Sequence, residues 1–510
     1  MVSSDNERIA KNTMVLYLRM LFSLGVSLYT SRVILKVLGF EDYGIYSVVG
    51  GIITLFCFIN GGLINATQRF ITFELGKGNI KKLSQVFSSA IQIHAILSFI
   101  ILILGETIGL YFLSEKMVIP TNRQYAAMIV YQCSIIATVV NLMSVPYNAD
   151  IVAHEKMSAF AYISIVEVIS KLLIVFLLLV IPGDNLVNYA IMMLVVQISI
   201  RFLYTTYCHK HFQETVYHHQ INKSILKEMV SFAGWSFWGN IAGILYTQGI
   251  NILLNIFFGP VVNAARGIAV QVQGVVQQFV SNFQMALNPQ ITKSYAVSDM
   301  EKMHTLMFRS AKFSFFLLYL LTLPILLETE YILSLWLSSV PENTVIFTKL
   351  ILIISLIYTT ANPCVIANQA TGKVKKYQAI VGGVLLLILP ISYISLLLGA
   401  PAYSVFIVHL IIESIAQYFR MYLLKGLINL PVREYLKNIY IPIIFTVLVT
   451  IAIPMITFIN MDYGLARFLC VTSISILSVT LGVFSFGLSM NERRMILCRL
   501  RLNRIINDRD

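Results

Sequence analysis

The sequence predicts an all-α integral membrane protein with about 14 transmembrane helices, and its composition carries that prediction. The chain has 510 residues, of which 57% are hydrophobic and only 12% are charged, whereas soluble proteins carry roughly 25% charged residues. Mean hydropathy is +0.79 over the full length. The apolar residues also fall into runs of the roughly 20 residues that a spanning helix needs. This composition excludes an ordinary soluble enzyme, a disordered chain and a small disulfide scaffold.

Fourteen apolar runs are predicted to span the bilayer. They cover 12–37, 44–66, 86–113, 122–145, 158–181, 186–208, 230–258, 264–288, 306–327, 343–362, 377–399, 402–424, 438–459 and 464–487. The runs 230–258 and 264–288 are the least apolar. Because polar side chains are costly in lipid, these two runs are the first place to look for function.

Lys and Arg gather in every second connection between these runs. The N-terminus, 67–85, 146–157, 209–229, 289–312, 363–376, 425–437 and 488–510 hold 26 of the 37 basic residues. The alternate connections hold two, Lys116 and Arg123, with eight carboxylates. Positive charge in short loops stays in the cytoplasm, so both termini are predicted to be cytoplasmic in an inner membrane. This topology accounts for the net charge of +13, and no nucleic-acid partner is expected. The basic tail suits anionic lipids.

The chain also carries signs of an internal duplication. The segment PYNADIVAHEKMSAFAY (146–162) resembles PCVIANQATGKVKKYQA (363–379), and in both a proline is expected to end a span. Two six-helix halves of the same orientation would form a parallel repeat about an axis along the membrane normal, with two further helices added. The predicted division is 1–208 for an N-lobe, 209–229 for a cytoplasmic linker, 230–424 for a C-lobe, 425–487 for the added spans and 488–510 for a basic cytoplasmic tail.

Amides and one arginine form a stripe on the two least apolar spans. Helical spacing places Asn240 and Asn251 on one face of 230–258. The stripe of 264–288 comprises six residues, which are Arg266, Gln273, Gln277, Ser281, Gln284 and Asn288. Amides suit sugar hydroxyls, and a guanidinium suits phosphate through bidentate hydrogen bonds. The alternative is interhelical hydrogen bonding, worth about 0.6 kcal/mol for each contact. Six such residues favour a wet cavity, although one or two of them could serve as such contacts.

Other charged residues within the predicted spans allow a structural and a functional interpretation. Arg19 either lines a cavity or reaches the head groups, and the same two alternatives stay open for Arg32 near the outer end of its span. Glu167 and Lys171, four residues apart, suit a structural pair, with a coupling-ion site as the alternative. For His409 and Glu413 a buried network is the default interpretation, with a proton relay as the alternative, and His94 is a further candidate for ion coupling.

Sequence features of an enzyme or metal site are missing. There is no G-x-x-x-x-G-K-[ST] phosphate loop, and the longest outer connection, 328–342, carries three glutamates without basic residues for a diphosphate. The six cysteines contain no C-x-x-C pair. Four linker histidines, His209, His211, His218 and His219, are expected to be solvated. No catalytic residue, metal or cofactor is therefore expected, and coupling to an H⁺ or Na⁺ gradient stays open.

Several stretches resemble one known family. They are YTSRVILKVLGFEDYGIYSVVGGI (29–52), INATQRFITFELGKGN (64–79), VNAARGIAVQVQ (262–273), NPQITKSYA (288–296) and ANQATGKVKKYQ (367–378). Together they resemble Wzx-type polysaccharide flippases of the MATE-like superfamily. The resemblance implies a two-lobed helical fold with a cationic cavity, for which Arg19, Arg32 and Arg266 are the matching positions. It implies movement of undecaprenyl-pyrophosphate-linked repeat units across the bilayer, with polysaccharide polymerase or assembly proteins as further candidate partners.

Two other transport functions remain open. The same fold would suit an ion-coupled multidrug antiporter, but an exporter of cations should place acids in its cavity, whereas the best stripe carries Arg266. A peptidoglycan-precursor flippase would carry a related lipid-linked substrate.

Overall fold

A computed structural model of the chain describes residues 11–27, scattered positions between 29 and 49, and 60–116, 119–216, 222–258, 260–337 and 340–494. Every regular element in these ranges is a helix. Eleven of the described helices are long and apolar enough to cross a membrane. The predicted spans 12–37 and 44–66 fall partly outside the described residues, and α8 (Pro260–Ala296) is too polar to be included. The all-α membrane class is confirmed, whereas the count of fourteen is not.

Contacts divide the chain into two compact units. The first unit comprises Met1–Asn240 and Met285–Asp299, and the second comprises Ile241–Gln284 and Met300–Asp510. Two long helices, α7 (Lys223–Phe258) and α8, contribute to both units.

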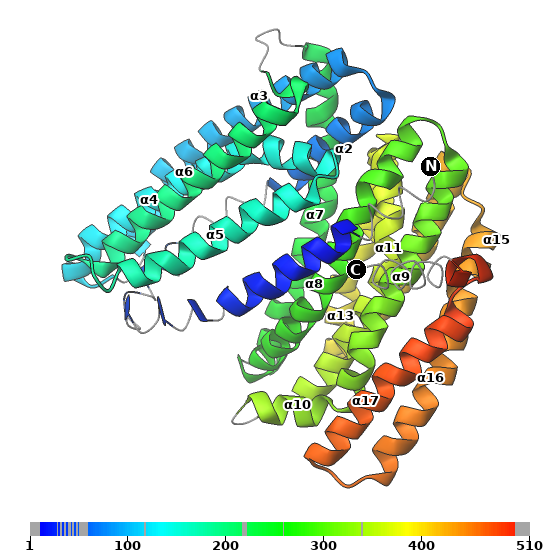
Figure 1. The fold of residues 1–510 in the computed structure, drawn as a ribbon. Coiled ribbons are helices and arrows are strands. Elements are labelled where there is room, and N and C mark those ends of the chain that lie inside the picture. Colours follow the sequence, from blue (N-terminus) through cyan, green and yellow to red (C-terminus); the bar gives the residue numbers. More distant parts are fainter. Residues whose placement is uncertain are drawn as a thin grey trace, which may run out of the picture. The chain divides into compact units, whose positions relative to one another are not determined.

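The first unit is built from long helices that run beside one another (Figure 1). They are the helical residues 11–27, α2 (Asn60–Lys77), α3 (Ile80–Leu104), α4 (Gln124–Ala153), α5 (Met157–Leu177) and α6 (Asn185–His211). The wider turn η1 (Gly105–Gly109) continues α3, and the Tyr131 hydroxyl donates to the Gly105 carbonyl at 2.7 Å. A side chain at position 105 would lie 2.8 Å from Ile135, so glycine allows α3 and α4 to pack this closely.

One arginine joins three connections of the first unit that the charge pattern places on the same side of the membrane. Arg123 donates to Asp184 at 2.6 Å and to Asp42 at 2.8 Å. Asp184 also caps α6 by accepting from the Leu186 and Val187 amides. Burial by itself would raise the pKa of Asp184, but the hydrogen bonds from Arg123 and these amides lower it. The carboxylate therefore stays ionised at neutral pH.

The turn between α4 and α5 is stabilised by contacts of Glu155, a non-glycine residue with a φ of +60°. Its buried carboxylate accepts from Lys293 and Gln290, each at 2.5 Å. Its carbonyl accepts from Asn12 at 3.1 Å. Three distant segments of the first unit thus meet at one buried acidic residue, which holds the turn in its left-handed conformation.

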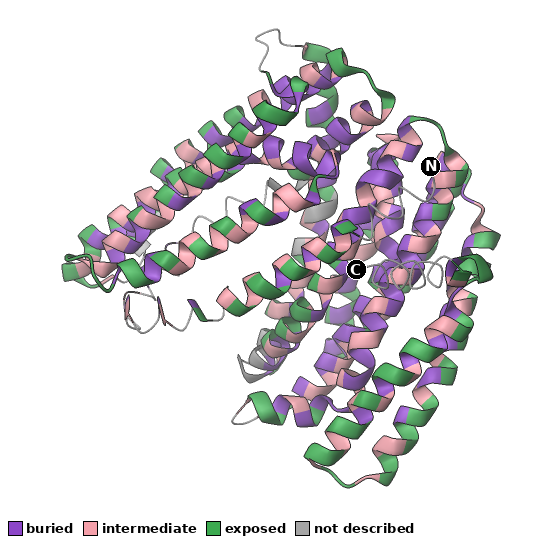
Figure 2. Ribbon diagram, in the orientation of Figure 1, coloured by how far each residue is buried: buried purple, intermediate pink, exposed green. Residues whose placement is uncertain are grey.

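The second unit has a buried pair of helices and an outer hairpin. Besides parts of α7 and α8 it contains α9 (Met300–Leu327), α10 (Thr329–Trp336), α11 (Thr344–Thr371), α12 (Val374–Leu386), α13 (Ile388–Leu397), α14 (Ser404–Ile428), α15 (Val432–Tyr435), α16 (Ile441–Asn460) and α17 (Leu465–Gly482). In α9, and likewise in α11, 61% of the residues in an apolar stretch of the helix are buried. In the span that contains α17, only 22% of such residues are buried. Figure 2 shows the exposed faces of α16 and α17. These faces are apolar, as lipid contact requires.

Two ion pairs stabilise the second unit. Lys312 on α9 pairs with Glu492 at 2.6 Å, and both side chains are buried. Arg467 on α17 pairs with Glu328 at 2.9 Å. Glu328 is buried and paired with Arg467, and α10 begins directly after it. The connection 328–342 therefore has fewer free carboxylates and a shorter irregular segment than the sequence suggests.

The expectation that prolines end two spans is wrong. Helix α4 continues through Pro146 to Ala153, and α11 continues through Pro363 to Thr371. A proline removes one backbone hydrogen bond and disfavours the turn before it, but the residues after it can remain helical. Asn148 and Asp150 therefore lie on the last turns of a helix and not in a loop.

Candidate functional site

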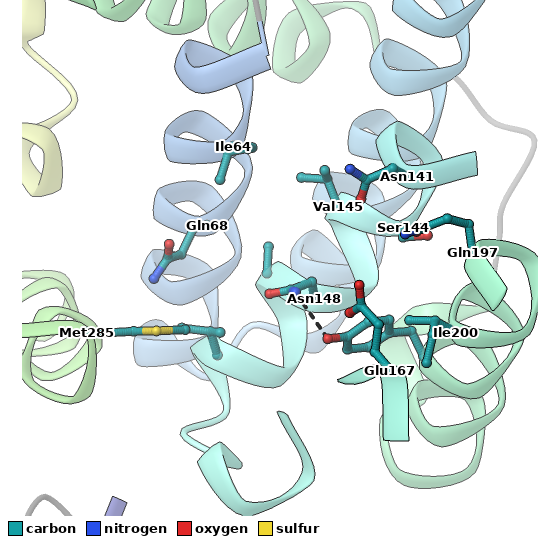
Figure 3. A pocket seen from close by; sticks show the side chains of 13 residues that line it. Ile64, Gln68, Asn141, Ser144, Val145, Asn148, Glu167, Gln197, Ile200 and Met285 are labelled. Carbon is teal, nitrogen blue, oxygen red and sulfur yellow. Dashed lines mark hydrogen bonds between the residues drawn. The ribbon is translucent and has the colours of Figure 1, made fainter. Parts of the chain in front are cut away.

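A pocket lies within the first unit, between α2, α4, α5 and α6 (Figure 3). Its volume is about 350 Å³, which falls within the range of small-molecule sites. It is lined by Ile64, Gln68, Asn141, Ser144, Val145, Asn148, Ala149, Val152, Glu167, Gln197, Ile200, Tyr204 and Met285. More than half of these side chains are polar, which is unusual for the interior of a spanning bundle.

Four amides set the chemistry of this pocket. Gln68 comes from α2, Asn141 and Asn148 from α4, and Gln197 from α6. Among the residues that the structure describes, only Asn148 of these four has a hydrogen-bond partner, the Tyr204 hydroxyl at 3.5 Å. Each amide can both donate and accept hydrogen bonds. The pocket therefore presents unused donors and acceptors to water or to a hydroxyl-rich ligand.

Glu167 is the charged residue of the pocket lining, and two cations lie near it. Lys171 donates to Glu167 at 2.6 Å, and Glu167 lines the pocket. Arg19 donates to Ser164 at 3.4 Å and lies over the Phe160 ring at 4.9 Å. It is close enough to Glu167 to interact electrostatically. Two cations beside one carboxylate make the surroundings of Glu167 positive overall, which favours an anionic ligand.

Helical periodicity explains why these residues converge. On α4, Asn141, Val145, Asn148 and Val152 are spaced by three or four residues, and so are Gln197, Ile200 and Tyr204 on α6. Asn148, Ala149 and Val152 could not be assigned to this lining from the sequence, because 146–157 was expected to be a connection. The signal was present, since extending the stripe of α4 past Pro146 brings Asn148 onto the face of Asn141.

The predicted stripe on α8 lies mainly in the second unit, where neighbouring helices bind several of its polar groups. Arg266 is 7% exposed and donates to the Asn251 side chain and, at 3.1 Å, to the Thr247 carbonyl. Gln273 donates to Ser355 at 2.7 Å. In the described part of the chain, the Gln277 side-chain oxygen is buried without a hydrogen-bond partner.

Gln284 has the most partners in this stripe. It donates to Ser314 at 3.1 Å and to the Thr359 carbonyl at 3.3 Å, and it accepts from Asn362. These contacts join α8 to α9 and α11. At this position, interhelical hydrogen bonding accounts for the amide.

The remaining predicted residues divide between the units. In the second unit, Arg420 donates to Glu413 at 2.7 Å, and the His409 ring packs edge-on to Tyr246 at 5.1 Å. In the first unit, His94 is fully buried, and its ring nitrogen lies 2.9 Å from the Ala90 carbonyl. Two further predicted positions, Arg32 and the side chain of Asn240, lie outside the described residues.

The decisive comparison is with protein families. A family described as "polysaccharide biosynthesis protein" matches residues 9–295, which is more than half of the chain. The chain belongs to this family. A comparison with curated protein sequences finds no match.

Solved structures of transporters share the fold of this family member. A multidrug resistance transporter of the MATE family, in an outward-facing conformation, has a TM-score of 0.72 at 12% identity, covering 83% of this chain and 96% of that one. A MATE protein in the straight conformation has a TM-score of 0.71 at 14% identity, with the same coverage of both chains. A MOP superfamily transporter from Pyrococcus furiosus gives 0.67 at 13% identity, covering 82% and 96%. The MATE-like fold is thereby confirmed, and the chain is a multi-span membrane protein of transporter fold.

Proposed function

We propose that this protein flips undecaprenyl-pyrophosphate-linked oligosaccharide repeat units from the cytoplasmic to the periplasmic leaflet of a bacterial inner membrane. The observation that carries the proposal is the amide-lined pocket of the first unit. Its lining offers hydrogen bonds that the described residues leave unused, and these suit the hydroxyls of a glycan. Membership of a polysaccharide biosynthesis family supports the same cargo.

The charges beside the pocket fit an anionic cargo better than a cationic one. Glu167 is neutralised by Lys171 at 2.6 Å, so it is not an unpaired acid awaiting a cation. Arg19 then leaves a net positive charge near the pocket. A pyrophosphate cannot cross roughly 30 Å of hydrocarbon unaided, and a basic, hydrated cavity would lower that barrier. A multidrug antiporter would be expected to have the opposite charge balance.

Flipping needs no covalent step. The lobes would open alternately to either side while the polyprenyl chain stays in lipid, and the movement could be coupled to an H⁺ or Na⁺ gradient. Both termini would be cytoplasmic, as the charge pattern predicts.

A deletion strain tests this function. We expect lipid-linked repeat units to accumulate on the cytoplasmic leaflet and the surface polysaccharide to be lost, with both restored by the wild-type gene. A double variant, Gln68→Ala with Asn141→Ala, should restore export poorly, because it removes two of the pocket amides. The matched control is Gln132→Ala on α4, whose amide contacts the exposed Glu106 at 3.2 Å outside the pocket. It should restore export fully.

Three results would contradict the proposal. Unchanged surface polysaccharide without accumulation in the deletion strain would remove the flippase function. Loss of drug efflux in that strain would favour the antiporter instead, and lethal accumulation of peptidoglycan precursor would favour the sister flippase.

A further inference from the structure

Three potential metal ligands meet at the end of α4 in the first unit. Asp150 lies on the last turn of α4, His154 follows that helix directly, and Glu214 lies on the short turn η4 (Gln213–Thr215) after α6. The His154 Nε2 atom lies 2.5 Å from a Glu214 oxygen and 3.9 Å from an Asp150 oxygen. One ligand atom from each residue lies within 4.8 Å of the other two.

Asp150 has the surroundings expected of a ligand that awaits a cation. Its side chain is 0% exposed, and within the described part of the chain neither carboxylate oxygen has a hydrogen-bond partner. An ionised carboxylate without a partner is strongly unfavourable in a buried site. One of its oxygens faces His154 at 3.9 Å, a distance too long for a hydrogen bond but suitable for sharing an ion.

Glu214 and His154 are held ready on the other side of the cluster. The Glu214 carboxylate is buried, with 5% of the residue exposed, and one of its oxygens lies against the His154 ring. The His154 ring stacks on Phe212, with centroids 4.0 Å apart and planes 9° apart. Packing therefore fixes the ring orientation, as in preorganised metal sites.

We propose that Asp150, His154 and Glu214 bind one divalent transition-metal ion of the zinc class. Tetrahedral zinc with ligands at 2.0–2.2 Å places its donor atoms roughly 3.3–3.6 Å apart. The two His154 separations of 2.5 and 3.9 Å lie on either side of that range, and the third separation is at most 4.8 Å, so side-chain movements without a change of fold suffice. One imidazole and two carboxylates suit zinc, cobalt or manganese. The three protein ligands leave one position for water.

The proposed ion would join two segments that are distant in sequence. It would tie the last turn of α4 to the segment that follows α6, from which the chain continues toward α7. Asn148, two residues before Asp150, lines the pocket of the first unit. The metal would thus stabilise the turns that position a pocket amide. This proposal stands on the cluster alone and does not depend on what the protein transports.

Metal content of the purified full-length protein tests the proposal. After treatment with EDTA, the protein in detergent is dialysed against zinc chloride, and bound zinc and the unfolding temperature are measured. The wild type should retain about one zinc ion per chain and unfold at a higher temperature than in EDTA. Asp150→Asn and His154→Gln should lose the ion and the temperature shift. The exposed His211 provides the matched control, and His211→Gln should bind zinc like the wild type.

A second variant separates metal binding from a simple ion pair. His154→Cys supplies a thiolate that can bind zinc but cannot form a cationic pair with Glu214. Retention of zinc by this variant supports the site. Equal unfolding temperatures of Asp150→Asn and the wild type in EDTA would show that the variant folds. Wild-type protein without zinc above the detergent blank, or full zinc binding by Asp150→Asn, would overturn the proposal.

Discussion

Amides of the same chemical type have different surroundings in the two units. In the first unit, Gln68, Asn141 and Gln197 line a pocket and have no hydrogen-bond partner among the residues described. In the second unit, Gln273 and Gln284 on α8 are bonded to neighbouring helices at 2.7–3.3 Å. An amide within a span can therefore stabilise helix packing or remain available to bind a ligand. Its hydrogen-bond partners determine which of these roles it has, whereas its residue type alone does not.

Ion pairs show the same contrast. Arg420 and Glu413 in the second unit lie 2.7 Å apart, with side chains 3% and 2% exposed. Lys171 and Glu167 in the first unit lie 2.6 Å apart, but their side chains are 34% and 27% exposed. Similar distances therefore occur in very different environments. We infer that the first pair stabilises the second unit, whereas the second pair sets the charge beside the pocket.

The largest effect should follow from breaking the buried pair. Arg420→Ala leaves Glu413 as an uncompensated buried charge, which should destabilise the protein by about 3–5 kcal/mol. Replacing both residues by apolar ones, Arg420→Met with Glu413→Leu, should recover most of the lost stability. No unpaired charge is then left buried. The unfolding free energy in mixed micelles measures both. Equal stability of Arg420→Ala and the wild type would remove the structural role of the pair.

A matched pair of glutamine variants should separate stability from export. Gln284→Ala removes contacts to three partners, two of them buried, and should lower the unfolding free energy by about 1–2 kcal/mol. Gln197→Ala removes a pocket amide and should change stability by less than about 0.5 kcal/mol. It should reduce the export rate about tenfold, the effect of losing roughly 1.4 kcal/mol of binding.

The comparison between the two amide sets fails if this pattern reverses. Export loss from Gln284→Ala at unchanged stability would place the ligand against α8, as the sequence suggested. Stability loss from Gln197→Ala would make the pocket amide a structural contact.

Breaking the partly exposed pair of Lys171 and Glu167 should affect stability less than breaking the buried pair of Arg420 and Glu413. In Lys171→Ala the remaining Glu167 borders the pocket and is 27% exposed, so its unpaired charge should cost less than that of Glu413, which is 2% exposed. Export should still change, since Glu167 becomes an unpaired acid in the pocket. Lys171→Arg keeps the charge and serves as the control. A large stability loss without a change in export would assign this pair to the fold.

The sequence located the spans but not the site. Eleven of the fourteen predicted spans correspond to helices that meet the length and composition requirements of a membrane span. The pairing of Glu167 with Lys171 was also visible, because both lie on one helix. The pocket was missed because its four amides come from three helices. The proposed metal cluster was missed for the same reason, since Glu214 lies 60 residues after His154.

What the sequence alone determined is the membrane class, because the bilayer imposes a length and polarity on every span that composition reveals directly. It also determined the helical faces, because the helical period is local. Only the tertiary structure decided which polar groups are occupied. It gave Gln284 three partners from two other helices and left Gln68 and Gln197 without one in the described part of the chain. Hydrogen-bond partners from distant segments depend on how helices pack, and that information is carried by the whole chain and not by any single span.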